Sequence, residues 1–357
     1  MGSRLARPRP VEIDLSGCRK VLVLEMWGLG DVVFAAPAIK ALMSHGAGCT
    51  VDLLVQPSSK PLLDLLGLGV KPVFFKFPWT RFTNKYNPAD YLRPSLWKLI
   101  RKLRAERYDL VLSVREDPRD AFLARLISPR HSLGYAAFGS GLFLSSSIKA
   151  GKSHKTEAWF HLLAFLGVLE APAQAFGKLR TEIRARLPAV APEEGKRIIL
   201  HCSARNPVRN WGVERFVELG GLLEKEGYRI LWLSDSNSSS SAAVPERWER
   251  MAGGLAEILA IIASCDLYIG NDGGLMHMAD LVGARICAVF GPTDPSLFFP
   301  YGQPHSIVFL PVVACRPCFD YCIYSRPICF DGITALDVRA KVLKILSAPA
   351  AQSPTAK

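Results

Sequence analysis

Two successive series of short apolar runs, each run followed by a helical period, constrain the fold of this chain more than any other feature. In the first half, VLVLE (Val21–Glu25) and TVDLLV (Thr50–Val55) are apolar at consecutive positions, which is typical of parallel strands buried on both faces. RIILHCS (Arg197–Ser203) and DLYIG (Asp266–Gly270) repeat this character in the second half. A strand–helix alternation that restarts predicts two α/β domains, each built on a doubly wound parallel sheet.

The boundary between the two series is expected in LPAVAPEEG (187–195), where prolines, small residues and charges interrupt the pattern. This predicts a first domain over residues 1–187 and a second over residues 188–357. A chain of 357 residues is long enough for two such cores. Ligands of doubly wound domains bind at the carboxyl ends of the strands, so the loops that follow strands are where chemistry is expected.

The net charge of +12 lies entirely in the first half of the chain. Residues 1–180 hold 26 Lys and Arg against 14 Asp and Glu, whereas residues 181–357 hold 18 of each. Two interpretations stay open: a solvated basic surface, or a surface for an anionic partner such as a phosphorylated glycolipid or a membrane headgroup layer. We expect no nucleic acid, because the basic residues are scattered and no aromatic-interleaved binding motif occurs.

The hydropathy pattern predicts a cytoplasmic protein. No apolar run reaches the roughly 20 residues that a membrane-spanning helix needs. The basic N-terminal segment (1–10) is followed by no apolar stretch, so a secretory signal is not expected.

The loop WGLGD (Trp27–Asp31) directly follows the first predicted strand. Gly28 and Gly30 allow the backbone to approach a ligand closely. Asp31 either caps the following helix or presents a carboxylate that takes a proton from a hydroxyl group. As a dinucleotide fingerprint the loop is weak, because Val33 replaces the third glycine, and this disfavours a nicotinamide-dependent dehydrogenase.

A second loop, NDGGLMHMA (271–279), stands between a predicted strand and a predicted helix. Asp272, Gly273 and Gly274 lie at the helix start, where free N–H groups and the helix dipole favour a phosphate. His277 lies on the helix itself. A capped helix with a hydrogen-bonded histidine is the simpler alternative, but the strand–glycine–helix context favours phosphate binding.

Two further loops of the second half also follow predicted strands. In SARNPVRNW (203–211), Ser203, Arg205 and Arg209 surround a proline turn, and the arginines are either exposed or bound to a diphosphate. In GPTDP (291–295), Thr293 either touches a nucleotide or belongs to a simple connection.

Four of the nine cysteines cluster near the C-terminus. Cys315, Cys318, Cys322 and Cys329 have the spacing C-x2-C-x3-C-x6-C, which suits a tetrahedral zinc or iron site. An iron–sulfur cluster and free reduced thiols are the alternatives. A closed four-thiolate site has no open position, so we expect a structural metal and not a catalytic one.

Taken together, these segments resemble the ADP-heptose:lipopolysaccharide heptosyltransferases, glycosyltransferase family nine. The resemblance rests on VLVLEMWGLGDVVFAAPAIKAL (21–42), HCSARNPVRNW (201–211), IGNDGGLMHMADLVGA (269–284) and AVFGPTDP (288–295). It runs in order from about residue 20 to 345. Some members of this family also carry a cysteine-rich C-terminal segment, which Cys315–Cys329 resembles.

The resemblance implies a GT-B fold, with two Rossmann-like domains facing a cleft, and inverting transfer of a heptose or related sugar. The donor would be a nucleotide-sugar, ADP-heptose by family, and the acceptor a hydroxyl of a lipopolysaccharide inner core or similar anionic glycolipid. Peripheral association with the cytoplasmic face of the inner membrane would follow.

On matching positions, the resemblance makes Asp31 the general base. It assigns donor contacts to Gly30, Ser203, Arg205, Arg209, Asp272, Gly273, Gly274, His277 and Thr293. No catalytic metal is expected, because fixed cations and the helix dipole would offset the diphosphate charge.

One departure from the family concerns the strand that ends near Ser234. In the family it leads into a Gly-rich, acidic turn at the nucleoside, but here it leads into Asp235 and a serine run (236–241). Two other functions also stay open: transfer to a protein acceptor, and binding of a nucleotide-sugar without transfer.

Overall fold

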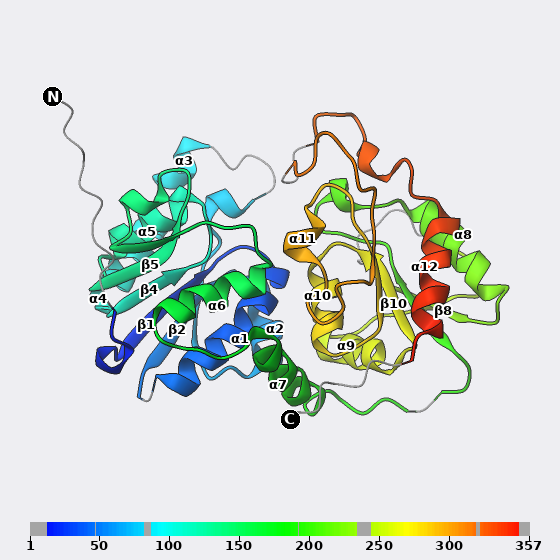
Figure 1. The fold of residues 1–357 in the computed structure, drawn as a ribbon, viewed down its shortest axis with the longest axis horizontal. Coiled ribbons are helices and arrows are strands. Elements are labelled where there is room, and N and C mark those ends of the chain that lie inside the picture. Colours follow the sequence, from blue (N-terminus) through cyan, green and yellow to red (C-terminus); the bar gives the residue numbers. More distant parts are fainter. Residues whose placement is uncertain are drawn as a thin grey trace. The chain divides into compact units, whose positions relative to one another are not determined.

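The computed structural model describes residues 13–46, 48–81, 87–191, 193–233, 244–318 and 322–349. The chain divides into two compact units, residues 1–175 (unit 1) and residues 176–357 (unit 2). Each unit is an α/β domain with one six-stranded parallel sheet (Figure 1). Residues 176–187, which the sequence pattern placed in the first domain, group with unit 2 by their contacts.

Unit 1 contains six strands and seven α-helices among its described residues, counting the helix that crosses into unit 2. The strands are β1 (Lys20–Glu25), β2 (Thr50–Val55), β3 (Lys71–Phe74), β4 (Leu110–Ser113), β5 (His131–Ala136) and β6 (Ser146–Lys149). The helices are α1 (Leu29–His45), α2 (Lys60–Leu66), α3 (Pro88–Tyr91), α4 (Pro94–Ala105), α5 (Pro118–Ile127), α6 (Lys155–Phe165) and α7 (Pro172–Arg184), which enters unit 2.

The sheet of unit 1 has the strand order β3-β2-β1-β4-β5-β6. Strand β1 is buried from Val21 to Glu25 and lies between β2 and β4, as the continuous apolar run predicted. On one face Leu22 and Leu24 pack with side chains of α4 and α5. Helices α1 and α6 pack against each other in the same unit.

Unit 2 repeats this architecture. Its strands are β7 (Arg197–His201), β8 (Arg229–Leu233), β9 (Glu249–Arg250), β10 (Leu267–Asn271), β11 (Ile286–Val289) and β12 (Ile307–Val308). Its helices are α8 (Val213–Glu224), α9 (Leu255–Ser264), α10 (Gly274–Leu281), α11 (Pro295–Phe298) and α12 (Ala335–Ser347).

The sheet of unit 2 has the order β12-β11-β10-β7-β8-β9, in which β7 and β10 take the central places that β1 and β4 take in unit 1. One face is covered by α8 and α12, whose apolar side chains pack with Ile198, Leu200 and Ile269 of the central strands. Both orders are those of a doubly wound sheet, which confirms the predicted fold class.

The order of the strands places a switch point in each sheet, where successive strands are added in opposite directions. It lies between β1 and β4 in unit 1 and between β7 and β10 in unit 2. Crevices at such points, outside the carboxyl ends of the strands, are where ligands of these folds bind. Asp31 follows β1 in the first turn of α1, and the segments with Arg209 and Asp272 follow β7 and β10.

Helix α7 is fastened to unit 2 by two arginines. Arg180 Nη2 donates to the main-chain oxygen of Asp280 (2.9 Å) and lies 3.2 Å from Asp280 Oδ1. Arg184 Nη1 donates to the main-chain oxygen of Val282 (2.9 Å). Asp280 is almost fully buried and also accepts from the main-chain N–H of Gly302 (2.8 Å), so the helix is part of this unit's polar network.

Two further features expected from the sequence are the lack of a membrane-spanning helix and the serine run after β8. Within the described residues, none of the helices combines the length and apolar character required to cross a bilayer. The serine run (236–241) and Asp235 lie outside the described residues.

Candidate active site

Asp31 lies in the first turn of α1 and is held on both carboxylate oxygens. Gly28 occupies the N-cap position, and its N–H donates to Asp31 Oδ2 (2.8 Å). The alternative in which Asp31 caps the helix is therefore wrong: Gly28 is the N-cap, and Asp31, three residues further on, accepts from its N–H. Its other oxygen, Oδ1, accepts from Nη2 of Arg115, and the carboxylate keeps 19% of its surface exposed. It is anchored and still accessible.

Arg115 comes from the loop after β4, the neighbour of β1 at the switch point. Its guanidinium lies over the ring of Trp27, 4.9 Å from the ring centre. The indole N–H groups of Trp27 and Trp79 each donate to one carboxylate oxygen of Asp120, both at 2.9 Å. These contacts fix the loop that presents Asp31.

Two buried acids stand around this arginine. Burial and the negative charge of Asp31 raise the pKa of Glu25 well above its usual value, and the positive charge of Arg115 offsets only part of this. Burial likewise raises the pKa of Asp120 to about 6. The site in unit 1 therefore combines a partly exposed carboxylate with two buried carboxyl groups whose pKa values are raised above their usual values.

A single cation of α6 also belongs to this region. Burial, and then the positive charge of Arg115, lower the pKa of Lys155, while the carboxylates of Glu116 and Asp31 act in the opposite direction. The sequence analysis above did not predict a role for Arg115, Glu25, Asp120 or Lys155. Arg115 could have been predicted, because residues that follow the central strands of a doubly wound sheet lie where its ligands bind.

In unit 2, the structure gathers Arg209, Asp272 and Thr293 at one point. Asp272 Oδ2 accepts from Thr293 Oγ1 (2.7 Å) and from Arg209 Nη1 (3.1 Å). His277 Nε2 lies 3.9 Å from the other oxygen, Oδ1. Asp272 is almost fully buried, whereas the side chain of Arg209 is 26% exposed. Asp272 thus holds a partly exposed cation.

The neighbouring Asn271 fixes the loops on which these groups stand. Its amide donates to the main-chain oxygen of Cys202 (2.8 Å), and its Oδ1 accepts from the main-chain N–H of Trp211 (3.0 Å). Asn271 is buried, and it ties the end of β10 to the loop after β7. The sequence did not predict that Asn271 would connect these two segments.

Gly273 and Gly274 lie where a ligand can approach the main chain closely. Gly273 is the N-cap of α10 and Gly274 its first residue, so the N–H groups of the first turn point out of the helix end. An added Cβ on Gly273 would meet nothing closer than the main-chain oxygen of Asn271 at 3.9 Å.

Of the other predicted donor residues, Ser203 is half-buried and Arg205 is exposed in the loop after β7. Gly30 lies in unit 1, next to Asp31.

The four clustered cysteines lie in a segment of unit 2 that is tied to the turn at Gly291. Arg316 Nε donates to the main-chain oxygen of Gly291 (2.9 Å), and the N–H of Cys318 donates to that of Pro292 (3.3 Å). Cys329 is buried in the core, and burial raises the pKa of its thiol to about 11, with further contributions from Cys318 and Cys315.

These thiols do not form a closed ligand set. Cys322 Sγ lies 3.8 Å from the main-chain oxygen of Arg326. Among the residues that the structure describes, which omit 319–321 within this segment, no three His, Cys, Asp or Glu side chains are arranged to hold a metal ion. The donor chemistry nevertheless suits zinc or iron, and Cys315, Cys318 and Cys329 are near enough to influence one another.

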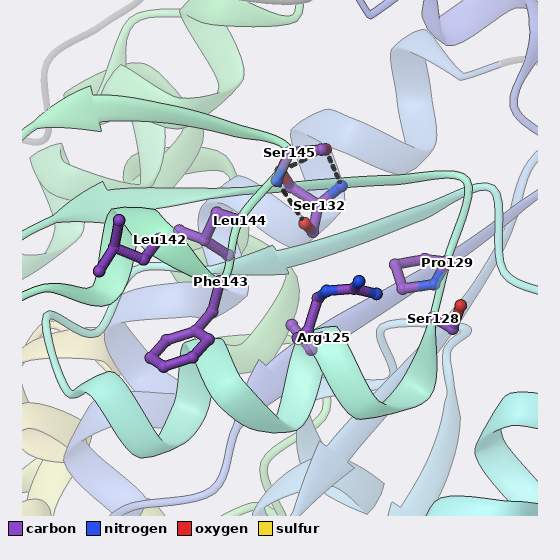
Figure 2. Close-up of a pocket in the computed structure, with 9 residues that line it drawn as sticks. Arg125, Ser128, Pro129, Ser132, Leu142, Phe143, Leu144 and Ser145 are labelled. Carbon is purple, nitrogen blue, oxygen red and sulfur yellow. Dashed lines mark hydrogen bonds between the residues drawn. The ribbon is translucent and has the colours of Figure 1, made fainter. Parts of the chain in front are cut away.

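A small cavity of 180 Å³ lies elsewhere in unit 1, between α5, β5 and the segment Leu142–Ser145 that leads into β6 (Figure 2). Ser132 and Ser145 cross-link their backbones beside it, with each main-chain N–H donating to the other hydroxyl (2.7 and 2.9 Å). None of the predicted site residues lines it. Its volume is below the roughly 300–1,000 Å³ of ligand pockets, so it does not mark the active site.

Comparison with known proteins identifies the family. Lipopolysaccharide heptosyltransferase 3 of Escherichia coli is 23% identical over 303 residues, covering 77% of this chain and 84% of that protein. Lipopolysaccharide heptosyltransferase 1 of E. coli K12 is 25% identical over 317 residues, covering 82% and 94%.

Among solved structures, E. coli heptosyltransferase WaaC with ADP superposes with a TM-score of 0.64 at 20% identity, covering 91% of this chain and 99% of that one. The iron-containing dodecameric glycosyltransferase TibC of enterotoxigenic E. coli H10407 gives 0.55 at 15% identity, covering 93% and 77%. These structures share the GT-B fold found here. The model of glycosyltransferase family 9 (heptosyltransferase) matches residues 96–326, and this chain therefore belongs to that family of glycosyltransferases.

Proposed function

We propose that this protein transfers a heptose from ADP-heptose, with inversion, to a hydroxyl of a lipopolysaccharide inner-core or similar anionic glycolipid. The observation that carries the proposal is the group of Arg209, Asp272 and Thr293 beside the N-terminus of α10, at the switch point of unit 2. The related WaaC binds ADP and ADP-2-deoxy-2-fluoro heptose, which supports this donor.

In the proposed reaction, Asp31 takes the proton from the acceptor hydroxyl while the oxygen attacks the anomeric carbon. The bond from that carbon to the diphosphate oxygen breaks, and ADP leaves with the extra negative charge. Arg209 and the N–H groups at the start of α10 offset this charge. No metal takes part in these steps.

Asp272 has a different role from the cations around it. A buried carboxylate would repel a diphosphate, but both Arg209 and Thr293 donate to its Oδ2. We propose that Asp272 orients Arg209 and leaves the remaining guanidinium N–H groups for the phosphate oxygens. Arg115 plays the corresponding part for Asp31, because it contacts one oxygen and leaves the carboxylate partly exposed.

Binding of ADP, measured by calorimetry, tests the donor site. Arg209→Ala should weaken ADP binding by about tenfold to a hundredfold, the value of a charge-assisted hydrogen bond. Arg247→Ala is the matched control, because Arg247 is an exposed arginine of the same unit that pairs with Glu224. Equal affinities of the wild type and Arg209→Ala would refute the assigned donor site.

Turnover tests the base. Asp31→Asn keeps the shape of the side chain and should bind ADP normally while product formation falls by about a hundredfold or more. Mass spectrometry of the product then decides the acceptor. A heptosylated glycolipid supports the proposal, a heptosylated protein supports the alternative acceptor, and ADP binding without any product supports a binding protein.

We also propose that Cys315, Cys318, Cys322 and Cys329 bind one structural zinc or iron ion, as four thiols within fifteen residues suggest. TibC, which shares the fold, is iron-containing. The ion would fasten this segment to the core through Cys329. A cytoplasmic location and peripheral contact with the inner membrane belong to the same proposal.

A further inference from the structure

Helix α4 (Pro94–Ala105) of unit 1 has two sharply different faces. Its four buried side chains, Leu96, Leu99, Ile100 and Leu103, pack into the core beside the strands. The rest of the helix is exposed. At about 100° per residue, the buried residues cover an arc of about 100°, and the helix is firmly seated on the sheet.

The exposed face carries only positive charge. Lys98, Arg101, Lys102 and Arg104 are all exposed, and at about 100° per residue they span an arc of about 160° opposite the core. Helix α4 contains no carboxylate.

The acids that flank the helix are engaged by other cations. Glu106, which follows α4, accepts from Lys20 and lies 4.0 Å from Lys71. Asp90, which precedes it, pairs with Arg81 (2.8 Å) and Arg93 (2.5 Å). Among the residues that the structure describes, these acids therefore leave the positive charge of the exposed face largely to solvent.

Two large exposed apolar side chains lie near the N-terminal end of α4. Leu92 is 74% exposed and Trp97 is 45% exposed. The indole N–H of Trp97 donates to the main-chain oxygen of Tyr91 (3.1 Å). Because its N–H already has a partner, the indole ring can enter an apolar layer without leaving an unpaired donor there.

We propose that the exposed face of α4, together with Leu92, is the surface by which this protein lies on an anionic phospholipid bilayer. The cations complement the negative surface of such a membrane, and a leucine and a tryptophan suit its interface. A soluble polyanion would satisfy the cations but would give Leu92 and Trp97 no apolar layer to enter. This inference deepens the proposed function, since it names the surface that brings the enzyme to a membrane-embedded glycolipid.

Co-sedimentation of the full chain with vesicles tests the proposal. The vesicles contain phosphatidylcholine alone, or phosphatidylcholine with about a quarter phosphatidylglycerol. We expect binding only to the anionic vesicles, and weaker binding as salt is added. Lys98→Glu/Arg101→Glu should lower the partition coefficient by at least about tenfold, and Trp97→Ala should lower it severalfold.

The matched control is Lys225→Glu/Lys344→Glu, which makes the same change in net charge at two exposed lysines of unit 2. It should bind the anionic vesicles nearly as well as the wild type. An equal loss in both double variants, or a wild type that stays in the supernatant, would overturn the proposal.

Circular dichroism and ADP binding check each variant for folding. The proposed donor site lies in unit 2 and the proposed membrane surface lies in unit 1, so either proposal can be refuted without the other. Vesicle binding without ADP binding would refute the donor site alone, and ADP binding without vesicle binding would refute the membrane surface alone.

Discussion

Replacing Arg115 by methionine removes the cation that contacts Asp31 and retains much of the side-chain bulk over Trp27. Both partners of the ion pair are about one-fifth exposed, at 21% and 19%. A hydrogen bond between charged groups in such a setting contributes about 1.5–3 kcal/mol. A factor of ten in rate corresponds to about 1.36 kcal/mol, so losing this contact should lower kcat by about tenfold to a hundredfold.

The direction follows from the contacts. Without the guanidinium, Asp31 Oδ1 loses its charged donor, and the carboxylate is then held through Oδ2 by the N–H of Gly28. The other groups that face Arg115 are Glu25, Asp117 and Asp120, and Lys155 is the nearby cation. A carboxylate that is held less firmly spends less time in the position from which it takes the proton, so kcat should fall.

The assay is release of ADP from saturating donor and acceptor. Arg115→Met should lower kcat by about tenfold to a hundredfold and leave the ADP dissociation constant unchanged. Arg115→Lys, which keeps the charge, should lose less of kcat than Arg115→Met. Arg125→Met controls for loss of an exposed arginine in the same unit. If Arg115→Met keeps the wild-type kcat, or if Arg115→Lys loses as much as Arg115→Met, the charge of the arginine does not act on Asp31 and the reasoning is wrong.

Three further predictions concern stability and metal content. Because the pKa of Asp120 is raised from 3.8 to about 6 in the folded protein, its stabilising contribution is fully present below about pH 4 and is lost as pH rises through about 6. Urea unfolding should show the wild type losing about 1.4 kcal/mol more between pH 5 and 8 than Asp120→Asn. Gly220→Ala in α8 would place a Cβ 2.3 Å from the ring of Trp248 and should destabilise unit 2 by about 1–3 kcal/mol, whereas Gly221→Ala, with nothing within 4 Å, should be neutral or stabilising. Elemental analysis of freshly reduced protein should find about one zinc or iron per chain, reduced in Cys315→Ser; absence of both metals would reject the site.

The central strands and the loops after them were predictable because their signals are local. Residues Val21–Glu25 and Leu267–Asn271 are buried on both faces, and a continuous apolar run is the direct result. The outer strands β5 (His131–Ala136) and β6 (Ser146–Lys149) were missed, because their glycine, serine and lysine residues interrupt any such run.

The partners within the candidate site were less accessible to sequence reasoning. The order of strands in the sheet decides that Arg115, 84 positions after Asp31, is the residue that contacts it. In the sequence, Asp120 looks like an ordinary acidic residue in the first turn of a helix. The structure shows that two indole N–H groups donate to its carboxylate. The strand order and these pairings are properties of the folded chain, and no spacing in the sequence encodes them.

The attachment of α7 decides how the chain can be divided for experiments. A donor-binding fragment that begins near residue 188 would lack Arg180 and leave Asp280 buried without its cation, which is strongly destabilising. A fragment that begins near Pro172 keeps the pair. Binding of ADP to the longer fragment, and aggregation of the shorter one, would follow from the loss of a helix that two arginines fasten to the unit.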